Sequence, residues 1–140
     1  MKDLHVGDGL SKGVSMNIYV RVIPHNQQRY VTVGDWWFDE FGDLQIRVSA
    51  MADWRYETLV AYHEQFEALA CKRAGIQEAL VTAFDIEFEN YRKAGNHAEP
   101  GDCLRAPYYR QHQLATIAER QLALELGVDW REYDEKVSRM

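Results

Sequence analysis

The residues best suited to chemistry lie in one short segment, YHEQFE, at residues 62–67. His63 and Glu67 are four positions apart, so on a helix both side chains project from the same face and could bind one metal ion. Apolar residues at helical spacing place His63 on an inward-facing stripe, with Glu67 at its margin. A carboxylate near a core costs several kcal/mol unless it is paired, hydrogen-bonded or bound to a cation. The pattern therefore indicates either a hydrogen-bonded pair or a metal site.

Two later segments with helical spacing also carry polar residues on faces that should be buried. Asp85 lies between apolar residues in one of them, and His112 and Glu119 share an apolar face in the other. If these side chains converge with His63 and Glu67, they form a site of histidines and carboxylates for zinc, manganese or iron. Ordinary roles stay open, because Glu119 could pair with an arginine of a neighbouring helix and Asp85 could be solvated at a helix edge.

The HEQFE segment resembles the HExxH helix of zincin metallopeptidases, in a minimal or degenerate gluzincin-type form, over about residues 44–90. The resemblance implies that His63 is a metal ligand and that Glu64 is the general base that accepts a proton from metal-bound water. Glu67 stands at the second ligand position, where the family has His. This exchange makes the site more anionic and favours manganese or iron more than is usual in the family.

The third ligand of gluzincins is an acid on a following helix, and the resemblance implies that Asp85 or Glu89 supplies it. The function expected from this resemblance is that of a small metal-dependent hydrolase. A different function stays open, namely a non-enzymatic, phage-type accessory or inhibitor protein that acts through protein contacts. For that function the chain offers Trp36 and Trp37, which either cover the end of a sheet or form an exposed anchor for a partner or a second copy.

A stretch of 13 residues without periodicity, GNHAEPGDCLRAP, contains four further residues that could bind a metal: His97, Glu99, Asp102 and Cys103. A loop of this length in a compact domain is either flexible or functional. Its side chains could ligate an ion or close over a site. Because loops are normally polar, a solvated loop is the simpler expectation.

The amino-acid composition disfavours some classes of binding partner for this chain. The chain has 140 residues, with 16 Lys and Arg against 22 Asp and Glu and a formal charge of −6. This balance disfavours nucleic acid, whose binding depends on basic side chains. No segment reaches the roughly 20 apolar residues of a membrane span, and the N-terminal residues lack the apolar run of a secretory signal. With two cysteines only, we expect reduced thiols and a cytoplasmic protein without membrane contact.

Hydrophobic periodicity predicts the elements that must position these side chains. Residues 1–15 have no period and are expected to form a flexible leader before a single domain over residues 16–140. Alternation predicts three strands in a small antiparallel sheet, the first two joined as a hairpin, at residues 18–23, 29–33 and 44–48. Helical spacing then predicts helices at about residues 53–75, 80–94 and 107–127 and a short one after Asp129. The expected class is α+β, with a three-stranded sheet followed by three to four helices that cover one of its faces.

Overall fold

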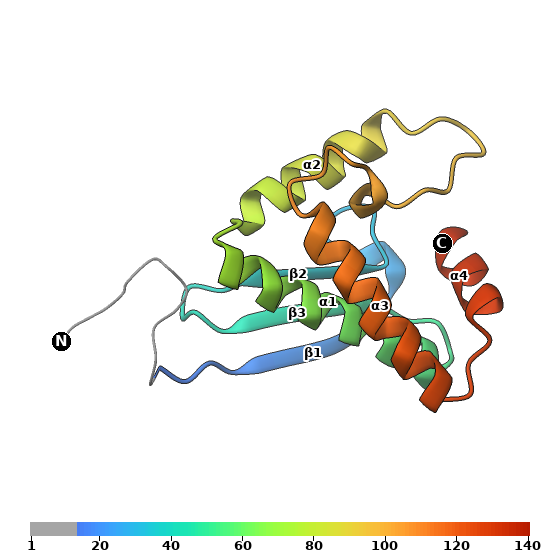
Figure 1. The fold of residues 1–140 in the computed structure, drawn as a ribbon, viewed down its shortest axis with the longest axis horizontal. Coiled ribbons are helices and arrows are strands. Elements are labelled where there is room, and N and C mark those ends of the chain that lie inside the picture. Colours follow the sequence, from blue (N-terminus) through green and yellow to red (C-terminus); the bar gives the residue numbers. More distant parts are fainter. Residues whose placement is uncertain (1–13) are drawn as a thin grey trace.

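The computed structural model describes residues 14–140, and residues 1–13 of the expected leader lie outside the described part. Three strands are followed by four helices (Figure 1): β1 (Ile18–Ile23), β2 (Gly34–Phe38), β3 (Leu44–Ser49), α1 (Trp54–Ala74), α2 (Glu78–Asn90), α3 (Tyr109–Glu125) and α4 (Trp130–Ser138). Short 3-10 turns η1 (His25–Gln27) and η2 (Pro100–Asp102) lie between them. The predicted α+β class, with strands first and helices after, is confirmed.

The sheet is mixed, which corrects the expected antiparallel arrangement. β3 is the central strand, and it pairs with β1 in parallel and with β2 antiparallel. In this register Ile46 of β3 lies opposite both Val20 of β1 and Trp36 of β2. The predicted hairpin between residues 18–23 and 29–33 is therefore wrong.

The error has a local cause, because the chain after β1 crosses the end of β3 instead of turning back along β1. His25 Nδ1, in η1, lies 2.8 Å from Ser49 Oγ, and Gln28 Nε2 donates to the same hydroxyl at 3.1 Å. These contacts carry residues 24–33 past β3, so that β2 pairs with its far side. Alternation predicts which residues are extended, but it does not predict the neighbouring strand.

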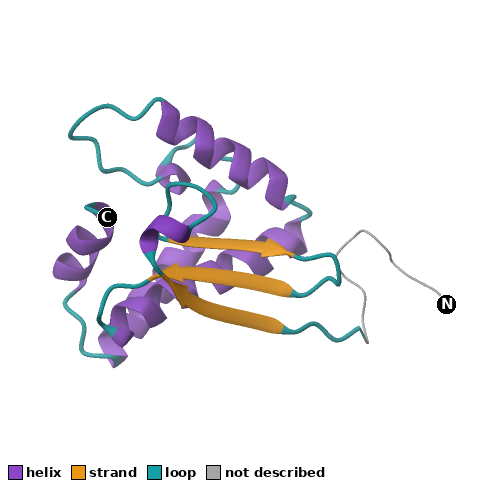
Figure 2. Ribbon diagram, turned by 180° about the vertical axis from the view of Figure 1, so that it is seen from behind, coloured by secondary structure: helices purple, strands orange, loops and turns teal. Residues whose placement is uncertain are grey.

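The helices cover one face of the sheet, as expected. α1 packs on β2 and β3, and α3 packs on α1 (Figure 1). The side chains of Leu44, Ile46 and Val48 are fully buried on the helix side of β3. Burial of each contributes about 1.5–3 kcal/mol, which holds α1 against the central strand. Seen from behind, the strands lie in front of the helical layer (Figure 2).

Signals in the sequence also define where α1 and α4 begin and end. The Asp53 carboxylate accepts a hydrogen bond from the Arg55 N–H at 2.9 Å, and α1 stops at Gly75, whose φ of 77° is a left-handed conformation that glycine adopts without strain. Asp129 accepts from the Glu132 N–H at 3.0 Å and caps α4. No helix within residues 14–140 combines the length and the apolar composition of a membrane span.

The two tryptophans of β2 lie in different environments because they alternate across the sheet. Trp36 faces α1 and is 3% exposed, which excludes the exposed-anchor alternative for this residue. Trp37 lies on the other face, half-buried, with the guanidinium groups of Arg29 and Arg47 at 4.5 and 5.0 Å from its ring centroid. A partner-binding role for Trp37 stays a prediction.

Candidate metal centre

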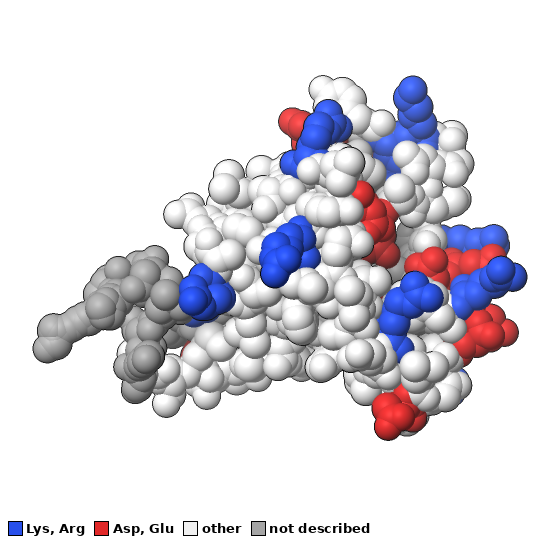
Figure 3. All heavy atoms as spheres, viewed as in Figure 1, with Lys and Arg blue, Asp and Glu red and all other residues white. Residues whose placement is uncertain are grey.

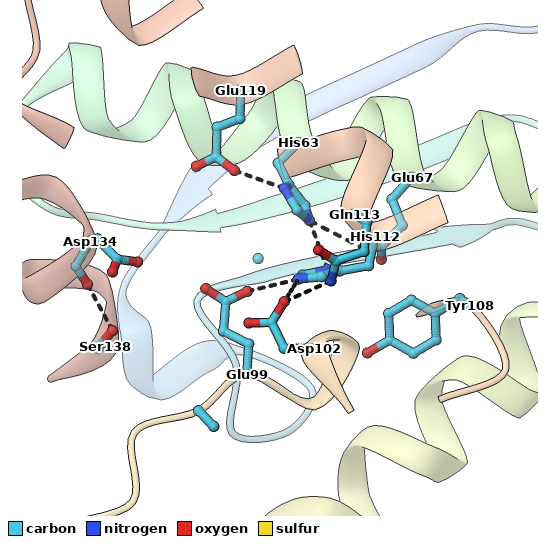
Figure 4. Close-up of polar contacts among 12 residues, drawn as sticks. His63, Glu67, Glu99, Asp102, Tyr108, His112, Gln113, Glu119, Asp134 and Ser138 are labelled. Carbon is cyan, nitrogen blue, oxygen red and sulfur yellow. Dashed lines mark hydrogen bonds and ion pairs between the residues drawn. The ribbon is translucent and has the colours of Figure 1, made fainter. Parts of the chain in front are cut away.

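Three polar side chains meet between α1 and α3, and we call His63, Glu67 and His112 the inner triad. His63 and Glu67 project from successive turns of α1, His112 projects from the first turn of α3, and none is more than 6% exposed. His63 Nε2 lies 3.2 Å from both Glu67 Oε2 and His112 Nδ1. Glu67 Oε2 and His112 Nδ1 are 3.0 Å apart (Figure 4). The three atoms therefore form a triangle with nearly equal sides.

The size of this triangle suits a metal ion. Ions such as Zn²⁺ bind imidazole nitrogen and carboxylate oxygen at roughly 2.0–2.2 Å. An ion at about 2.1 Å from each of the three atoms would have them at angles of about 90–100° from one another. Two imidazoles and one carboxylate on one side of an ion, with other positions open, are a donor set of catalytic zinc sites and of non-haem iron sites. The inner triad could therefore hold a divalent ion and leave room for water or substrate.

His63 and Glu67 each have a second polar atom that lies outside the triangle, and this atom contacts a residue outside the inner triad. His63 Nδ1 lies 2.8 Å from Glu119 Oε1, so a neutral ring that donates there keeps its lone pair on Nε2, toward the triangle. Tyr133 of α4 donates its hydroxyl proton to the other oxygen of Glu119. On the sheet side, Trp36 Nε1 donates to Glu67 Oε1 at 3.0 Å. These contacts orient both ligand groups.

The loop before α3 holds His112 in the same way. His112 Nε2 lies 3.3 Å from both Glu99 Oε1 and Asp102 Oδ1, and Gln113 donates to Asp102 at 2.9 Å. The ring packs directly on Gly101, where an added Cβ would lie 2.3 Å from His112 Cγ. Carboxylates on the far nitrogen are the usual outer partners of metal-binding histidines. Glu99, Asp102 and His112 could also share a cation, but a neutral imidazole has one lone pair, so His112 ligates on one side only.

The remaining acidic candidates do not join the triangle. Glu119 lies behind His63. Asp85 accepts hydrogen bonds from Tyr30, at 3.0 Å, and from Tyr108. Burial raises the pKa of Asp85 to about 7, although the bond from Tyr108 opposes the shift. We therefore assign Asp85 to the wall of the site, and the ligand role expected for it stays untested.

Glu89 and Glu64, the two acids named by the zincin resemblance, differ in their surroundings. Glu89 forms two hydrogen bonds of 2.7 Å with Arg92, so its charge is already compensated. Glu64 lies against Gly34 of β2, where an added Cβ would be 2.8 Å from Glu64 Cδ. Burial and the nearby charge of Glu67 raise the pKa of Glu64 well above its usual value.

A cavity of about 560 Å³ opens beside the inner triad. Its walls come from the start of β2, from α1 and α2, from the loop that leads to η2, and from the end of α4. Glu64 and Asp85 line it together with the triad. Cavities of roughly 300–1,000 Å³ accommodate small ligands, so the candidate centre is open to a molecule of that size.

Burial and hydrogen bonding have opposite effects on the pKa of each member of the inner triad. Burial disfavours the charged form of Glu67, but hydrogen bonds from His112 and His63 outweigh it and lower its pKa to about 2. Burial likewise opposes charge on the histidines. The bonds to Glu119 and Glu67 nevertheless raise the pKa of His63 well above its usual value, and those to Asp102 and Glu67 raise that of His112 to about 12. Without an ion, pairing with these carboxylates therefore favours the protonated form of both rings.

Metal binding is accordingly expected to release protons and to strengthen as the pH rises. A ligand nitrogen must lose its proton, and the raised pKa values of His63 and His112 favour the protonated rings when no ion is bound. Displacement of one proton from each ring should by itself increase the apparent affinity by on the order of 100-fold per pH unit between about pH 6 and 8. Titration calorimetry in two buffers of different ionisation enthalpy measures the number released. An affinity that does not change with pH would contradict the assignment of both rings.

The chain matches no known protein family, curated protein or solved structure. The candidate function therefore rests on the geometry of the centre.

Two groups of contacts at this centre are not predicted from the sequence. Tyr133 and Trp36 carry no signal in the sequence, because each reaches the centre only through the packing of α4 or β2. Glu99 and Asp102 lie in a loop whose polar residues are expected to be solvated, yet they contact His112. The sequence offered two signals for these two acids: the absence of periodicity over 13 residues, and the cluster of His97, Glu99, Asp102 and Cys103 that could close over a site.

Proposed function

We propose that this chain is a small metal-dependent hydrolase in which the inner triad holds one divalent ion and Glu64 is the general base. One observation carries the proposal: every member of the triad is oriented through its other polar atom by a residue outside the triad. The partners are Glu119 for His63, Trp36 for Glu67, and Glu99 with Asp102 for His112. Metal centres are built in this way, because outer partners fix the tautomer and direction of each ligand.

The charge around the centre supports the same proposal. Six acidic side chains lie around the two histidines: Glu64, Glu67, Asp85 and Glu119 at the cavity, and Glu99 and Asp102 at the outer nitrogen of His112. Among residues 14–140, none of these six forms an ion pair with a lysine or arginine. Buried charges are normally paired or bound to a metal. Without an ion, protonated His63 and His112 compensate part of this negative charge. A divalent cation would supply positive charge in place of the protons that these rings lose on binding.

The three donors are of the same types as in the zincins that the sequence resembles, but the glutamate and the second histidine have exchanged places in the chain. Thermolysin-like zinc enzymes bind their ion with two histidines and one glutamate. Here Glu67 stands at the second position of the helix motif, and His112 would supply the donor from later in the chain. Two imidazoles and one carboxylate are retained, which leaves zinc, manganese and iron as the candidate ions.

The chemistry follows from the groups that line the cavity. A divalent ion would supply Lewis-acid chemistry that lowers the pKa of an adjacent water molecule. Glu64 lines the same cavity as the triad, where a general base that acts on a bound water or substrate must lie. The raised pKa of Glu64 favours its protonated form when no ion is bound. A nearby cation favours the carboxylate form that a base requires.

Metal analysis and one variant test the proposal together. The chain, purified without chelator or histidine tag, should contain about one zinc, manganese or iron ion per chain. Glu64→Gln should keep the ion and reduce kcat/KM on a panel of peptides, esters and phosphate esters by about 100-fold or more, because general-base catalysis contributes about 10²–10⁴-fold. Glu89→Gln is the matched control, since Glu89 lines the same cavity but pairs with Arg92.

The outcomes separate the two halves of the proposal. A metal content far below one per chain, also after incubation with each of the three ions, would end the metal assignment. An ion that persists in Glu64→Gln with unchanged hydrolysis would make the centre structural.

A further inference from the structure

β1 is an edge strand whose outer side pairs with no strand in residues 14–140. The Leu44 N–H donates to the Asn17 carbonyl at 2.9 Å, which sets the direction of every peptide group along β1. In a parallel ladder, alternate residues bond to the neighbouring strand. Ile18, Val20 and Val22 therefore direct their N–H and C=O groups outward, away from β3.

These three residues also expose apolar side chains. Ile18, Val20 and Val22 are 40%, 46% and 50% exposed. They share the helix side of the sheet with the buried residues of β3. Within residues 14–140, α1 packs over β2 and β3 and leaves β1 uncovered (Figure 1). The surface over β1 at the lower front of the molecule shows no acidic or basic side chain (Figure 3).

We propose that β1 is the interface of a symmetric homodimer, in which two β1 strands pair antiparallel across a two-fold axis at Val20. In this register Val20 faces the partner's Val20, and Ile18 faces the partner's Val22 on the same side of the sheet. Each of the three residues contributes one outward donor and one outward acceptor, and all of them find partners. The result is one continuous sheet through both copies, with apolar side chains opposite apolar side chains.

The opposite face of β1 is self-complementary in the same register. Tyr19 lies opposite the partner's Arg21, which pairs an aromatic ring with a cation. Moving the axis to Arg21 would set two guanidinium groups against each other, and it would place Ile18 opposite the partner's Pro24, which has no N–H to donate. Charge and hydrogen bonding therefore favour the axis at Val20, and an interface that matches itself fits a second copy of this chain.

The edge also lacks the usual protection. Soluble proteins protect edge strands with lysine, proline, a bulge or an inward-pointing charge. Within Ile18–Ile23 the only charged residue is Arg21, and its side chain lies on the face opposite Val20. An edge with this composition is suited to pairing with another strand.

Sedimentation equilibrium on the full chain tests the dimer. Wild type is expected to have twice the 16.3 kDa mass of one chain, with or without chelator, because β1 contributes no residue to the metal centre. Val20→Lys places two ammonium groups opposite each other at the axis. This variant should raise the dimer dissociation constant by at least about 100-fold. Val31→Lys, at a residue that is 66% exposed and outside the strands, should leave the dimer intact.

Amide hydrogen exchange identifies the strand involved. The amides of Ile18, Val20 and Val22 should be protected in wild type and exchange rapidly in Val20→Lys. Those of Tyr19 and Arg21, which bond to β3, should stay protected in both proteins and show that the variant is folded. A monomeric wild type, or a dimer that Val20→Lys leaves intact, would overturn the proposal.

Discussion

A His63→Ala variant is expected to bind its divalent ion at least about 100-fold more weakly than wild type. Loss of an outer partner alone costs about 10–100-fold in metal affinity, and His63 is a donor of the triangle itself. The same substitution removes the group that Glu119 contacts, so the buried Glu119 carboxylate keeps only the hydroxyl of Tyr133. Competition with a chromophoric chelator measures the affinity.

His97→Ala is the matched control for this variant. His97 lines the same cavity but is exposed in the loop, and it belongs to no group of converging ligands in the described part of the chain, residues 14–140. It should bind the ion as wild type does, and circular dichroism should show that both variants are folded. Equal affinity of His63→Ala and His97→Ala would contradict the inner triad as the binding site.

Gly101→Ala should weaken metal binding by about 10-fold or more, although it adds one methyl group and no charge. The new Cβ would lie 2.3 Å from His112 Cγ and 2.4 Å from His112 Nδ1, far inside contact distance. The ring must therefore move, and Nδ1 is the atom that faces the other two donors. Crowding of this kind also costs typically 1–3 kcal/mol of stability. Ion affinity and the midpoint of thermal unfolding together measure the effect.

Gly34→Ala is the control for Gly101→Ala. It also crowds a buried side chain, but it does not displace a proposed metal ligand. Its Cβ would lie 2.7 Å from Val60 Cγ1 and 2.8 Å from Glu64 Cδ, and it approaches no member of the inner triad that closely. This variant should keep the ion and lose hydrolysis, because the displaced group is the proposed base. If Gly101→Ala binds the ion as tightly as wild type, His112 is not a donor in the orientation described.

The two glycine variants illustrate how the centre is assembled. Gly101 lets the loop after α2 approach the His112 ring, and Gly34 lets β2 approach Glu64 on α1. Each glycine is needed because a side chain of the candidate centre occupies the space that its Cβ would fill. Such contacts join segments that are far apart in the chain, so the local sequence around residues 34 and 101 does not predict them.

The fold was predictable to the extent that its determinants are local. The cap at Asp53, the stop at Gly75 and the spacing of apolar residues predict α1, and the structure confirms it within a residue or two. The alternation of side chains along the sequence predicts β1 and β3 as strands, but it does not predict that they pair in parallel. That pairing depends on how residues 24–33 cross β3, through side chains that contact Ser49 from a distance in the sequence.

For the centre itself, the sequence by itself determined which faces carry the polar residues. Helical spacing places His63 with Glu67, and His112 with Glu119, on faces that are buried. Helical spacing reports direction around one axis only, so it cannot distinguish a ligand from a partner of a ligand. Only the packing of α3 on α1 brought His112 to the triangle and set Glu119 behind His63, because the relative rotation and height of two helices depend on every side chain between them.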